Sequence, residues 1–237
     1  ITEKPSAAKM IARALADDKP KQKKDSGSIY YDLQHQGEEI MVGCAAGHLY
    51  TVTEKEKSFK YPSFDIEWQP SWKASKGSKF TKKYLTLLQK LGKKADSFVV
   101  ACDYDIEGEV IGLNVVRFAC KQKDAERMKF STLTPNEVRQ AYANRSKHLD
   151  WGQAKAGETR HFLDWLYGIN FSRALMLAMK KTGMFKVLST GRVQAPALKI
   201  VVDREKEIRA FEPEPYWELG LITKKPKIEA AHENNKF

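Results

Sequence analysis

Four carboxylates stand within seven residues of a chain that is otherwise strongly basic. The stretch ACDYDIEGEVIG, residues 101–112, contains Asp103, Asp105, Glu107 and Glu109, with no basic residue among them. The formal net charge of all 237 residues is +11. A solvated helix start is one explanation, because the amino-terminal end of a helix is partly positive and favours carboxylates. The other explanation is a site for a hard divalent cation, which prefers oxygen ligands.

The place of these carboxylates in the chain favours the cation site. Asp103 and Asp105 follow an apolar strand expected at 97–102, and Glu3 follows a strand end at the amino terminus. Ligands of parallel α/β sheets gather where strands end and the chain turns into helices. Because Asp103 and Asp105 are two residues apart in an extended turn, their side chains point the same way. We therefore expect an Mg²⁺ site facing a phosphate, since Mg²⁺ takes one or two carboxylates and keeps several waters.

A lysine-rich segment supplies the opposite charge. Between Ser71 and Lys94 there are eight lysines and no acid, interleaved with Trp72, Phe80 and Tyr84. Over the whole chain, 41 lysines and arginines face 30 acidic residues. Basic stretches with aromatics suit a nucleic-acid backbone, because each neutralised phosphate releases counterions. The alternative is a solvated lysine-rich helix face. A basic chain with one concentrated acid cluster indicates a polyanion held near a divalent metal.

The order of expected strands and helices predicts an α/β fold that positions these groups. We expect, in order, a strand end and helix at 1–15, a polar flexible segment at 16–28, a buried strand and Gly-His turn at 38–52, a long connection at 54–80, a basic helix at 78–92, and strands at 97–102 and 127–130, each followed by a helix. Thr134 and Glu137 occupy capping-box positions in the last helix. Such strand–helix alternation implies a parallel sheet.

From about Asp150 the pattern changes to nearly all helix. Arg160 and Asp164 lie one helical turn apart, which suits either a surface ion pair or a functional one. A Ser-Thr-Gly-Arg turn at 189–192 opens a further helix. An arginine and a glutamine beside a helix start suit phosphate or base contacts.

Other features limit the class of protein. No apolar run is long enough to cross a membrane, and the start shows no signal-peptide pattern. Cys44, Cys102 and Cys120 lie far apart, which indicates buried thiols in a reducing compartment rather than disulfides or a zinc site. With 42% hydrophobic residues the chain is ordinary globular material. Because its first residue is Ile1, we expect that residues before it are missing.

Seven stretches, in order, resemble the type IA DNA topoisomerases of the topoisomerase III-like and archaeal kind. They are ITEKPSAAK, GHLYTV, SFDIEWQPSW, ACDYDIEGEVIG, RMKFSTLTPNEVRQAY, RHFLDWLYGINFSRAL and LSTGRVQAPALKIVVDREKEIRAF. ACDYDIEGEVIG resembles the DxDxEGE Toprim motif, which primases and some nucleases also carry. The resemblance implies an α/β Toprim domain at 1–148, with a parallel sheet flanked by helices. It also implies part of a mainly α-helical DNA-groove domain at 149–214 and the start of a strand-passage arch at 215–237.

The resemblance also implies roles for individual residues. Glu3 matches the Toprim glutamate near the scissile phosphate, and Lys4 matches a lysine that stabilises developing phosphate charge. Asp103, Asp105 and Glu107 match the Mg²⁺ triad, with Glu3 across from it and Mn²⁺ as a substitute metal. Glu109 lies outside the triad and is expected to cap the helix. The residues expected to contact DNA are His48, Arg160, Asp164, Ser189, Arg192 and Gln194.

The activity implied is passage of one DNA strand through a transient break in another. In this family a tyrosine attacks the backbone, becomes linked to the 5′-phosphate, and leaves again when the strand is resealed without ATP. The nucleophile lies in a segment like ITYxRTDS, and none of the nine tyrosines here has that context. We therefore expect an amino-terminal portion that binds mainly single-stranded DNA, is a monomer, and is inactive without the remaining carboxyl-terminal part of the same enzyme. The expected location is the cytoplasm, in association with the nucleoid. For a eukaryotic protein the expected location is the nucleus.

Two other function classes stay open at this point. A Toprim primase or nuclease needs polymerase-type or nuclease motifs downstream, where this chain has the GRVQ helix pattern. A non-catalytic basic DNA-binding module would use the acid cluster only as a helix cap, so metal binding separates it from the enzymes. Reverse gyrase carries the same module, so a helicase domain before Ile1 is a further possibility.

Overall fold

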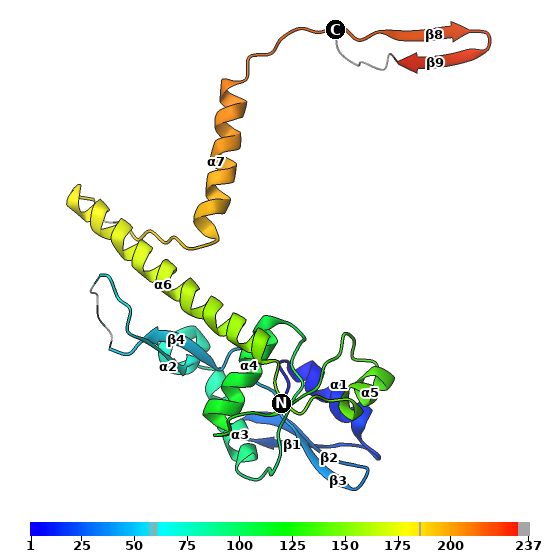
Figure 1. Cartoon of the computed structure of the whole chain (residues 1–237), viewed down its shortest axis with the longest axis vertical. Coiled ribbons are helices and arrows are strands. Elements are labelled where there is room, and N and C mark those ends of the chain that lie inside the picture. The colour runs from blue at the N-terminus through cyan, green and yellow to red at the C-terminus, as the bar shows by residue number, and fades with distance from the viewer. Residues whose placement is uncertain (57, 59–60, 185, 232–237) are drawn as a thin grey trace. The chain divides into compact units, whose positions relative to one another are not determined.

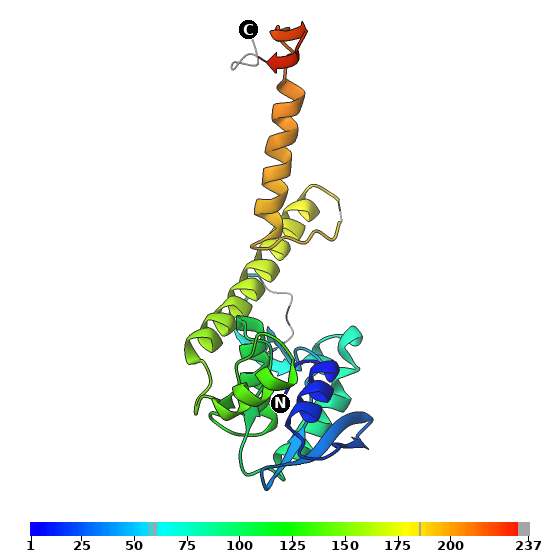
Figure 2. The same cartoon turned by 90° about the vertical axis from the view of Figure 1, so that its right-hand side faces the viewer.

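The computed structural model of the protein describes residues 1–56, 58, 61–184 and 186–231 (Figures 1 and 2). The chain divides into two compact units, Ile1–Gly191 and Arg192–Phe237. Within the described residues, no helix combines the length and the apolar character needed to cross a membrane.

A short parallel ladder lies at the centre of the first unit. Thr2 bridges in parallel to Cys44 on one side and to Ala101 on the other. The Thr2 N–H donates to the Gly43 carbonyl at 2.9 Å, and the Ala101 N–H donates to the Ile1 carbonyl at 2.7 Å. The predicted parallel sheet is therefore confirmed, although its strands are short.

The ladder continues through β6 (Val99–Val100), which pairs in parallel with β7 (Glu126–Arg127). These strands correspond to the expected ones at 97–102 and 127–130. Glu3 directly follows the ladder residue Thr2, and Asp103 lies two residues after the ladder residue Ala101. Because the segments are parallel, both residues emerge at the same edge.

An antiparallel sheet precedes the lysine-rich segment and overturns one expectation. β1 (Lys21–Asp25), β2 (Ser28–His35) and β3 (Glu38–Val42) pair in the order β1-β2-β3, so the prediction of a flexible segment at 16–28 is wrong. β1 has no apolar alternation because it is an exposed edge strand, and lysines are typical of such edges. It pairs fully with β2, which supplies the buried side chains.

The expected long connection at 54–80 also contains regular structure. β4 (Tyr50–Glu54) pairs antiparallel with β5 (Ile66–Pro70), and α2 (Ser71–Ala74) and a 3₁₀ turn, η1 (Lys76–Ser78), follow. The prediction is wrong over these residues, because five paired residues in β5 are too few to show a clear period. Residues 57, 59 and 60 of the predicted connection lie outside the described residues.

Helices cover the ladder much as their apolar spacing predicts. α1 (Pro5–Leu15) begins with a proline, buries Ala8, Ile11, Ala12 and Leu15, and packs on α5 (Pro135–Ala143). The expected basic helix is α3 (Thr81–Gly92), whose leucines are buried.

The capping box expected in α5 is not formed. Thr134 is the N-cap residue, but its side chain makes no cap hydrogen bond. Glu137 instead accepts the backbone N–H groups of Ser131 and Thr132, at 2.5 and 3.0 Å. The capping pattern therefore marks where the helix starts, while the carboxylate orders the loop before it.

Two further helices position the acidic residues. α4 (Ile106–Asn114) runs into a short π-helical turn, η2 (Val115–Ala119), and packs closely on α6 (Trp151–Lys181) (Figure 1). A Cβ atom on Gly157 of α6 would lie 2.4 Å from Val110 Cγ2 and 2.6 Å from the Ile106 carbonyl oxygen. Only glycine permits this approach, which brings the first turn of α4 beside α6.

The second unit contains α7 (Gln194–Ala210) and a hairpin of β8 (Gly220–Lys224) and β9 (Lys227–Ala231). The helical character expected after residue 150 is present in α6 and α7. Residues 232–237, the end of the predicted arch segment, lie outside the described residues. The domain limits at 148 and 214 stay predictions.

Candidate metal centre and nucleic-acid surface

The acid turn, defined here as residues 103–109, is shaped by the start of α4 within it. The Asp105 carboxylate caps α4 by accepting the Gly108 backbone N–H at 2.7 Å. A Cβ atom on Gly108 would lie 2.2 Å from the Asp103 carbonyl oxygen, so a side chain cannot fit there. The spacing of acids and glycine thus folds the turn tightly over the first turn of α4. Asp105 keeps a second carboxylate oxygen for another ligand.

A buried ion pair between Arg127 and Glu109 stabilises this turn. Arg127 Nε lies 2.6 Å from Glu109 Oε2, and neither side chain is exposed. The guanidinium also donates to the carbonyls of Cys102 (3.0 Å) and Asp103 (2.9 Å). Glu109 Oε1 accepts the Asp150 backbone N–H at 2.8 Å, at the start of α6. The expectation that Glu109 caps the helix is wrong: Asp105 is the cap, and Glu109 anchors the turn.

Glu3, Lys4 and Asp103 meet at the edge of the ladder. Lys4 Nζ lies 2.6 Å from Asp103 Oδ2 and 3.5 Å from Glu3 Oε1. Desolvation raises the pKa of the Glu3 carboxyl, and the charge of Asp103 raises it further. The two carboxylates therefore face one position that favours a cation.

Glu107 points toward a different set of side chains. Its Oε2 lies 2.9 Å from His161 Nε2 and 3.1 Å from His48 Nε2, and its Oε1 lies 3.4 Å from Arg160 Nη1. Arg160 Nε in turn lies 3.6 Å from Asp164 Oδ2. Burial lowers the pKa of His48, and His161 lowers it further. The structure thus brings two expected DNA-contact residues, His48 and Arg160, against an expected metal ligand, and a third, Asp164, against Arg160.

His161 is a site residue that the sequence interpretation missed. Its signal was its place next to Arg160 on the same helix. Within the described part of the chain, His48, Glu107 and His161 are the one group of three possible ligands whose ligand atoms all lie within 4.8 Å. The four carboxylates expected to share Mg²⁺ do not form such a group.

The residues at the ladder edge nonetheless fit Mg²⁺. Glu3 and Asp103 offer carboxylate oxygens, and 41% of the Asp103 side chain is exposed, which leaves room for waters. Asp105, two residues on, has one oxygen not used by its cap. Since Mg²⁺ requires only one or two protein carboxylates, Asp103 and Asp105 suffice to hold it.

The remaining expected DNA-contact residues lie elsewhere in the chain. Ser189 is exposed in the segment that ends the first unit, where the Thr190 N–H donates to Ser172 Oγ of α6 at 3.0 Å. Arg192 and Gln194 belong to the second unit, and Gln194 begins α7. Their contacts with DNA stay predictions.

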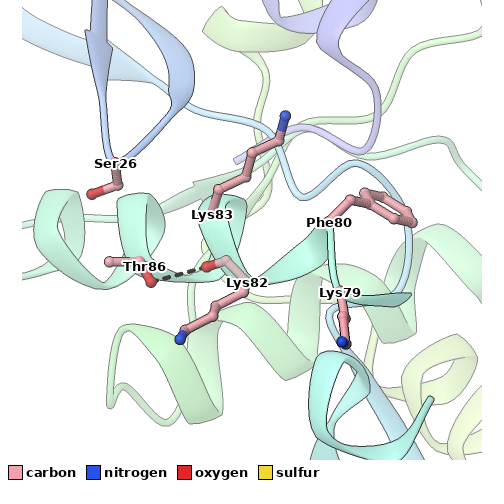
Figure 3. Close-up of a pocket in the computed structure, with 6 residues that line it drawn as sticks. All are labelled: Ser26, Lys79, Phe80, Lys82, Lys83 and Thr86. Atoms are coloured by element: carbon pink, nitrogen blue, oxygen red, sulfur yellow. Dashed lines mark hydrogen bonds between the residues drawn. The ribbon is translucent and has the colours of Figure 1, made fainter. Parts of the chain in front are cut away.

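The lysine-rich face, defined here as the lysines of residues 71–94, surrounds a shallow hollow of about 350 Å³ (Figure 3). The residues lining it are Ser26, Lys79, Phe80, Lys82, Lys83 and Thr86. The Phe80 ring is 55% exposed, and Lys82 Nζ lies 4.8 Å from the centre of the Trp72 ring. Among the described residues, Lys90 is the one lysine of this face that has an ion-pair partner, Asp25 at 2.6 Å. Exposed lysines beside an exposed ring suit a nucleic-acid strand.

Comparison with known proteins identifies two family matches. The Toprim domain family matches residues 1–133, and the DNA topoisomerase family matches residues 148–237. Similar curated proteins include DNA topoisomerase 1 of Pyrococcus furiosus and of Methanocaldococcus jannaschii, each 47% identical over 100% of this chain, which covers 23% and 31% of their lengths. DNA topoisomerase 3 of Vibrio cholerae is 34% identical over 94% of this chain, which covers 34% of it.

A solved structure agrees with these matches. Full-length topoisomerase I from Thermotoga maritima aligns with a TM-score of 0.67 and 26% identity, over 100% of this chain and 35% of that one. The chain spans about a third or less of the length of these curated relatives.

Proposed function

The chain belongs to the type IA DNA topoisomerases, and from that premise we propose that it binds Mg²⁺ and single-stranded DNA and supplies the acidic site for transient cleavage and rejoining of one strand. The observation that carries the proposal is the meeting of Glu3, Lys4 and Asp103 at the edge where parallel strands end. Glu107 of α4 and Arg160 of α6 face each other at 3.4 Å. A cation, a phosphate-binding lysine and a strand-binding arginine are the parts that phosphoryl transfer requires around the scissile group.

The residues at this edge have different proposed roles. Lys4 Nζ is placed to neutralise charge that develops on the phosphate oxygens. Glu3 lies beside Lys4 and Asp103, so its carboxylate is proposed to lie next to the metal and the scissile phosphate. Asp103 and Asp105 hold Mg²⁺, which when bound supplies further neutralising charge, and Mn²⁺ can replace it.

The strand itself is held by arginine and histidine side chains. We propose that Arg160, positioned by Asp164 and Glu107, grips a phosphate, with His48 alongside. Ser189, Arg192 and Gln194 are proposed as further contacts with the DNA strand. Unpaired DNA is preferred because its bases can stack on exposed aromatics while a basic channel follows its backbone. The lysine-rich face, with Phe80, provides a second contact of the same kind.

The attacking oxygen lies outside these 237 residues in this proposal. None of the nine tyrosines has the sequence context of the family nucleophile. In-line transfer at phosphorus needs an attacking oxygen as well as charge stabilisation. These residues alone should therefore bind DNA but neither relax a supercoiled plasmid nor form a covalent adduct. We further propose that the chain acts as a monomer with the rest of the enzyme, in the compartment that holds the DNA.

The test combines metal titration with adduct trapping. Mg²⁺ and Mn²⁺ are titrated against the wild type and an Asp103→Asn/Asp105→Asn variant, and single-strand binding is measured for wild type and Arg160→Ala. We expect weaker metal binding in the first variant and weaker DNA binding in the second. Identical metal curves would instead support a non-catalytic DNA-binding module. A denaturing gel that shows a protein–oligonucleotide adduct would place the nucleophile among the chain's own tyrosines.

A Toprim primase or nuclease is the competing enzyme class. Nucleotide incorporation, or strand cleavage with no protein linkage, would support that class over the topoisomerase. The DNA topoisomerase family match at 148–237 favours the topoisomerase.

A further inference from the structure

Two imidazoles and one carboxylate converge beside the proposed Mg²⁺ position. His48 lies in the loop before β4, Glu107 in the first turn of α4, and His161 on α6. One ligand atom from each lies within 4.8 Å of the other two. We infer that these three residues form a binding site for a transition-metal dication of the Zn²⁺, Co²⁺ or Ni²⁺ class.

The distances fit such a site. Glu107 Oε2 lies 2.9 Å from one imidazole Nε2 and 3.1 Å from the other. Ligands of a tetrahedral Zn²⁺ ion, at bond lengths of about 2.0–2.1 Å, stand about 3.3 Å apart. The two distances to Glu107 are each within about 0.4 Å of this separation, and the two imidazole nitrogens lie within 4.8 Å of one another, so rotations of the three side chains can admit the ion. The three protein ligands leave a fourth position open to water or to a phosphate oxygen.

The ligand types select the metal. Mg²⁺ prefers oxygen ligands and keeps several waters, whereas imidazole suits Zn²⁺, Co²⁺ and Ni²⁺. This set of two nitrogens and one oxygen lies next to the oxygen-only set of Glu3, Asp103 and Asp105. The two sets therefore differ in the metal that they prefer.

The backbone segments that carry the ligands are fixed to one another. Ser71 Oγ donates to the His48 carbonyl oxygen at 2.9 Å. Arg173 of α6 binds the two carboxylate oxygens of Glu54, at the end of β4, at 2.7 and 2.8 Å. The close approach of α4 to α6 at Gly157 fixes the third segment. A site prepared in this way loses little conformational entropy when it binds a ligand.

Both ring Nε2 atoms now face the Glu107 carboxylate, which accepts their hydrogen bonds. A metal ion would replace the proton at each Nε2. The His48 Nδ1 is buried without a hydrogen-bond partner within the described residues, and it can carry the remaining proton of the neutral ring. The Trp68 ring flanks His161 at 5.3 Å between centroids and holds that imidazole in place.

Metal at this site would regulate the proposed activity. Coordination would take Glu107 away from Arg160, and a dication would repel that guanidinium, which the proposed function places on the DNA strand. Zn²⁺ should therefore weaken single-strand binding by the wild type. This consequence rests on the proposed function, while the binding site itself does not.

Cobalt provides the direct test, because Co²⁺ bound by nitrogen and oxygen ligands at low coordination number absorbs visible light strongly. Co²⁺ is titrated into the 237-residue chain and then displaced with Zn²⁺. We expect one Co²⁺ per chain, and more than about 100-fold weaker binding in His48→Gln and His161→Gln, since losing even an outer partner of a ligand costs about 10–100-fold. His148→Gln is the matched control, because His148 is a histidine in an exposed pair with Asp124 at 2.9 Å.

The outcomes separate this site from the proposed function. Wild type without a Co²⁺ spectrum, or ligand variants that bind as wild type does, would overturn the metal site. Imidazole NMR signals of the wild type provide a check that needs no variant: Zn²⁺ should shift those of His48 and His161 and leave those of His148 in place. Failure of Asp103→Asn/Asp105→Asn to alter Mg²⁺ binding would overturn the proposed function and leave the Co²⁺ result standing.

Discussion

The acid turn and the lysine-rich face carry opposite charge and are built in opposite ways. In the acid turn, nearly every charged group is held by a named partner: Asp105 by a backbone N–H, Glu109 by Arg127, and Asp103 by Lys4. In the lysine-rich face, the described structure pairs one lysine of eight. A precise arrangement of carboxylates requires buried supports, because like charges repel. A surface that attracts a polyanion requires only exposed charge.

We therefore expect substitutions in the acid turn to lower the stability of the fold, and substitutions in the lysine-rich face to lower salt-dependent DNA binding. The largest effect should come from Arg127→Met, which leaves the buried Glu109 carboxylate without its partner. We expect a loss of about 3–5 kcal/mol in the free energy of unfolding, measured by urea denaturation. A loss under about 1 kcal/mol would show that the turn does not depend on this pair.

The Arg127→Met/Glu109→Leu variant separates the cost of an unpaired buried charge from the loss of the other hydrogen bonds of Arg127. Removing both charges should recover part of the loss, because no uncompensated charge stays buried. Recovery should be incomplete, since Arg127 also donates hydrogen bonds to the carbonyls of Cys102 and Asp103. Full recovery would mean that the guanidinium matters only as a counter-ion.

The next effect should come from Gly108→Ala. Its Cβ would lie 2.2 Å from the Asp103 carbonyl oxygen, so the turn must open. We expect a loss of about 1–3 kcal/mol in unfolding free energy and weaker Mg²⁺ binding. Gly77→Ala, in the lysine-rich face, is the matched control, because its nearest neighbour would be Ser75 Oγ at 3.7 Å. Equal losses in the two variants would show that the acid turn is no more tightly constrained than the lysine-rich segment.

The edge position of Glu3 and Asp103 was predictable because each follows an apolar strand segment, and parallel order brings such ends to one edge. The helix starts at Pro5 and Pro135 were predictable because their signals lie within one turn.

The supports of the turn were not predictable, because they join residues far apart in the chain. Nothing near Glu109 indicates that Arg127 will bury it, and nothing near Glu107 indicates that His48 and His161 will meet there. The edge strand β1 was missed for a different reason. β1 is held to β2 by backbone hydrogen bonds, and its side chains are mostly exposed. Because they bury little apolar surface, its sequence shows no apolar alternation.

A smaller effect should follow from the crowding of carboxylates at the ladder edge. The pKa of Glu3 is raised in the folded state by desolvation and then by Asp103. A carboxyl group whose pKa is raised by folding stabilises the folded state at pH values below its ordinary pKa of 4.5. That stabilisation is lost as the pH rises through the folded-state pKa. The Glu3→Gln variant should therefore gain stability relative to wild type as the pH rises above about 4.5.

The measurement for Glu3 is the difference in unfolding free energy between wild type and variant across pH. We expect a difference below about 1 kcal/mol at pH 7, because the group is partly exposed. Added Mg²⁺ should reverse it by stabilising wild type. A difference that does not depend on pH would show that Glu3 experiences no crowding.

The smallest effect on stability should come from the lysine-rich face. Lys79, Lys82 and Lys83 line its hollow without an ion-pair partner among the described residues, so changing all three to glutamine should alter the unfolding free energy by less than about 0.5 kcal/mol. Binding should respond instead. Each lysine that neutralises a phosphate adds about 0.7 to the slope of log affinity against log salt for single strands, so the triple variant should lower the slope by up to about 2. Lys90→Gln, whose charge is already paired with Asp25, is the control and should change the slope least. An unchanged slope in the triple variant would show that this face is a solvated surface and that the acid turn and its neighbours alone hold the strand.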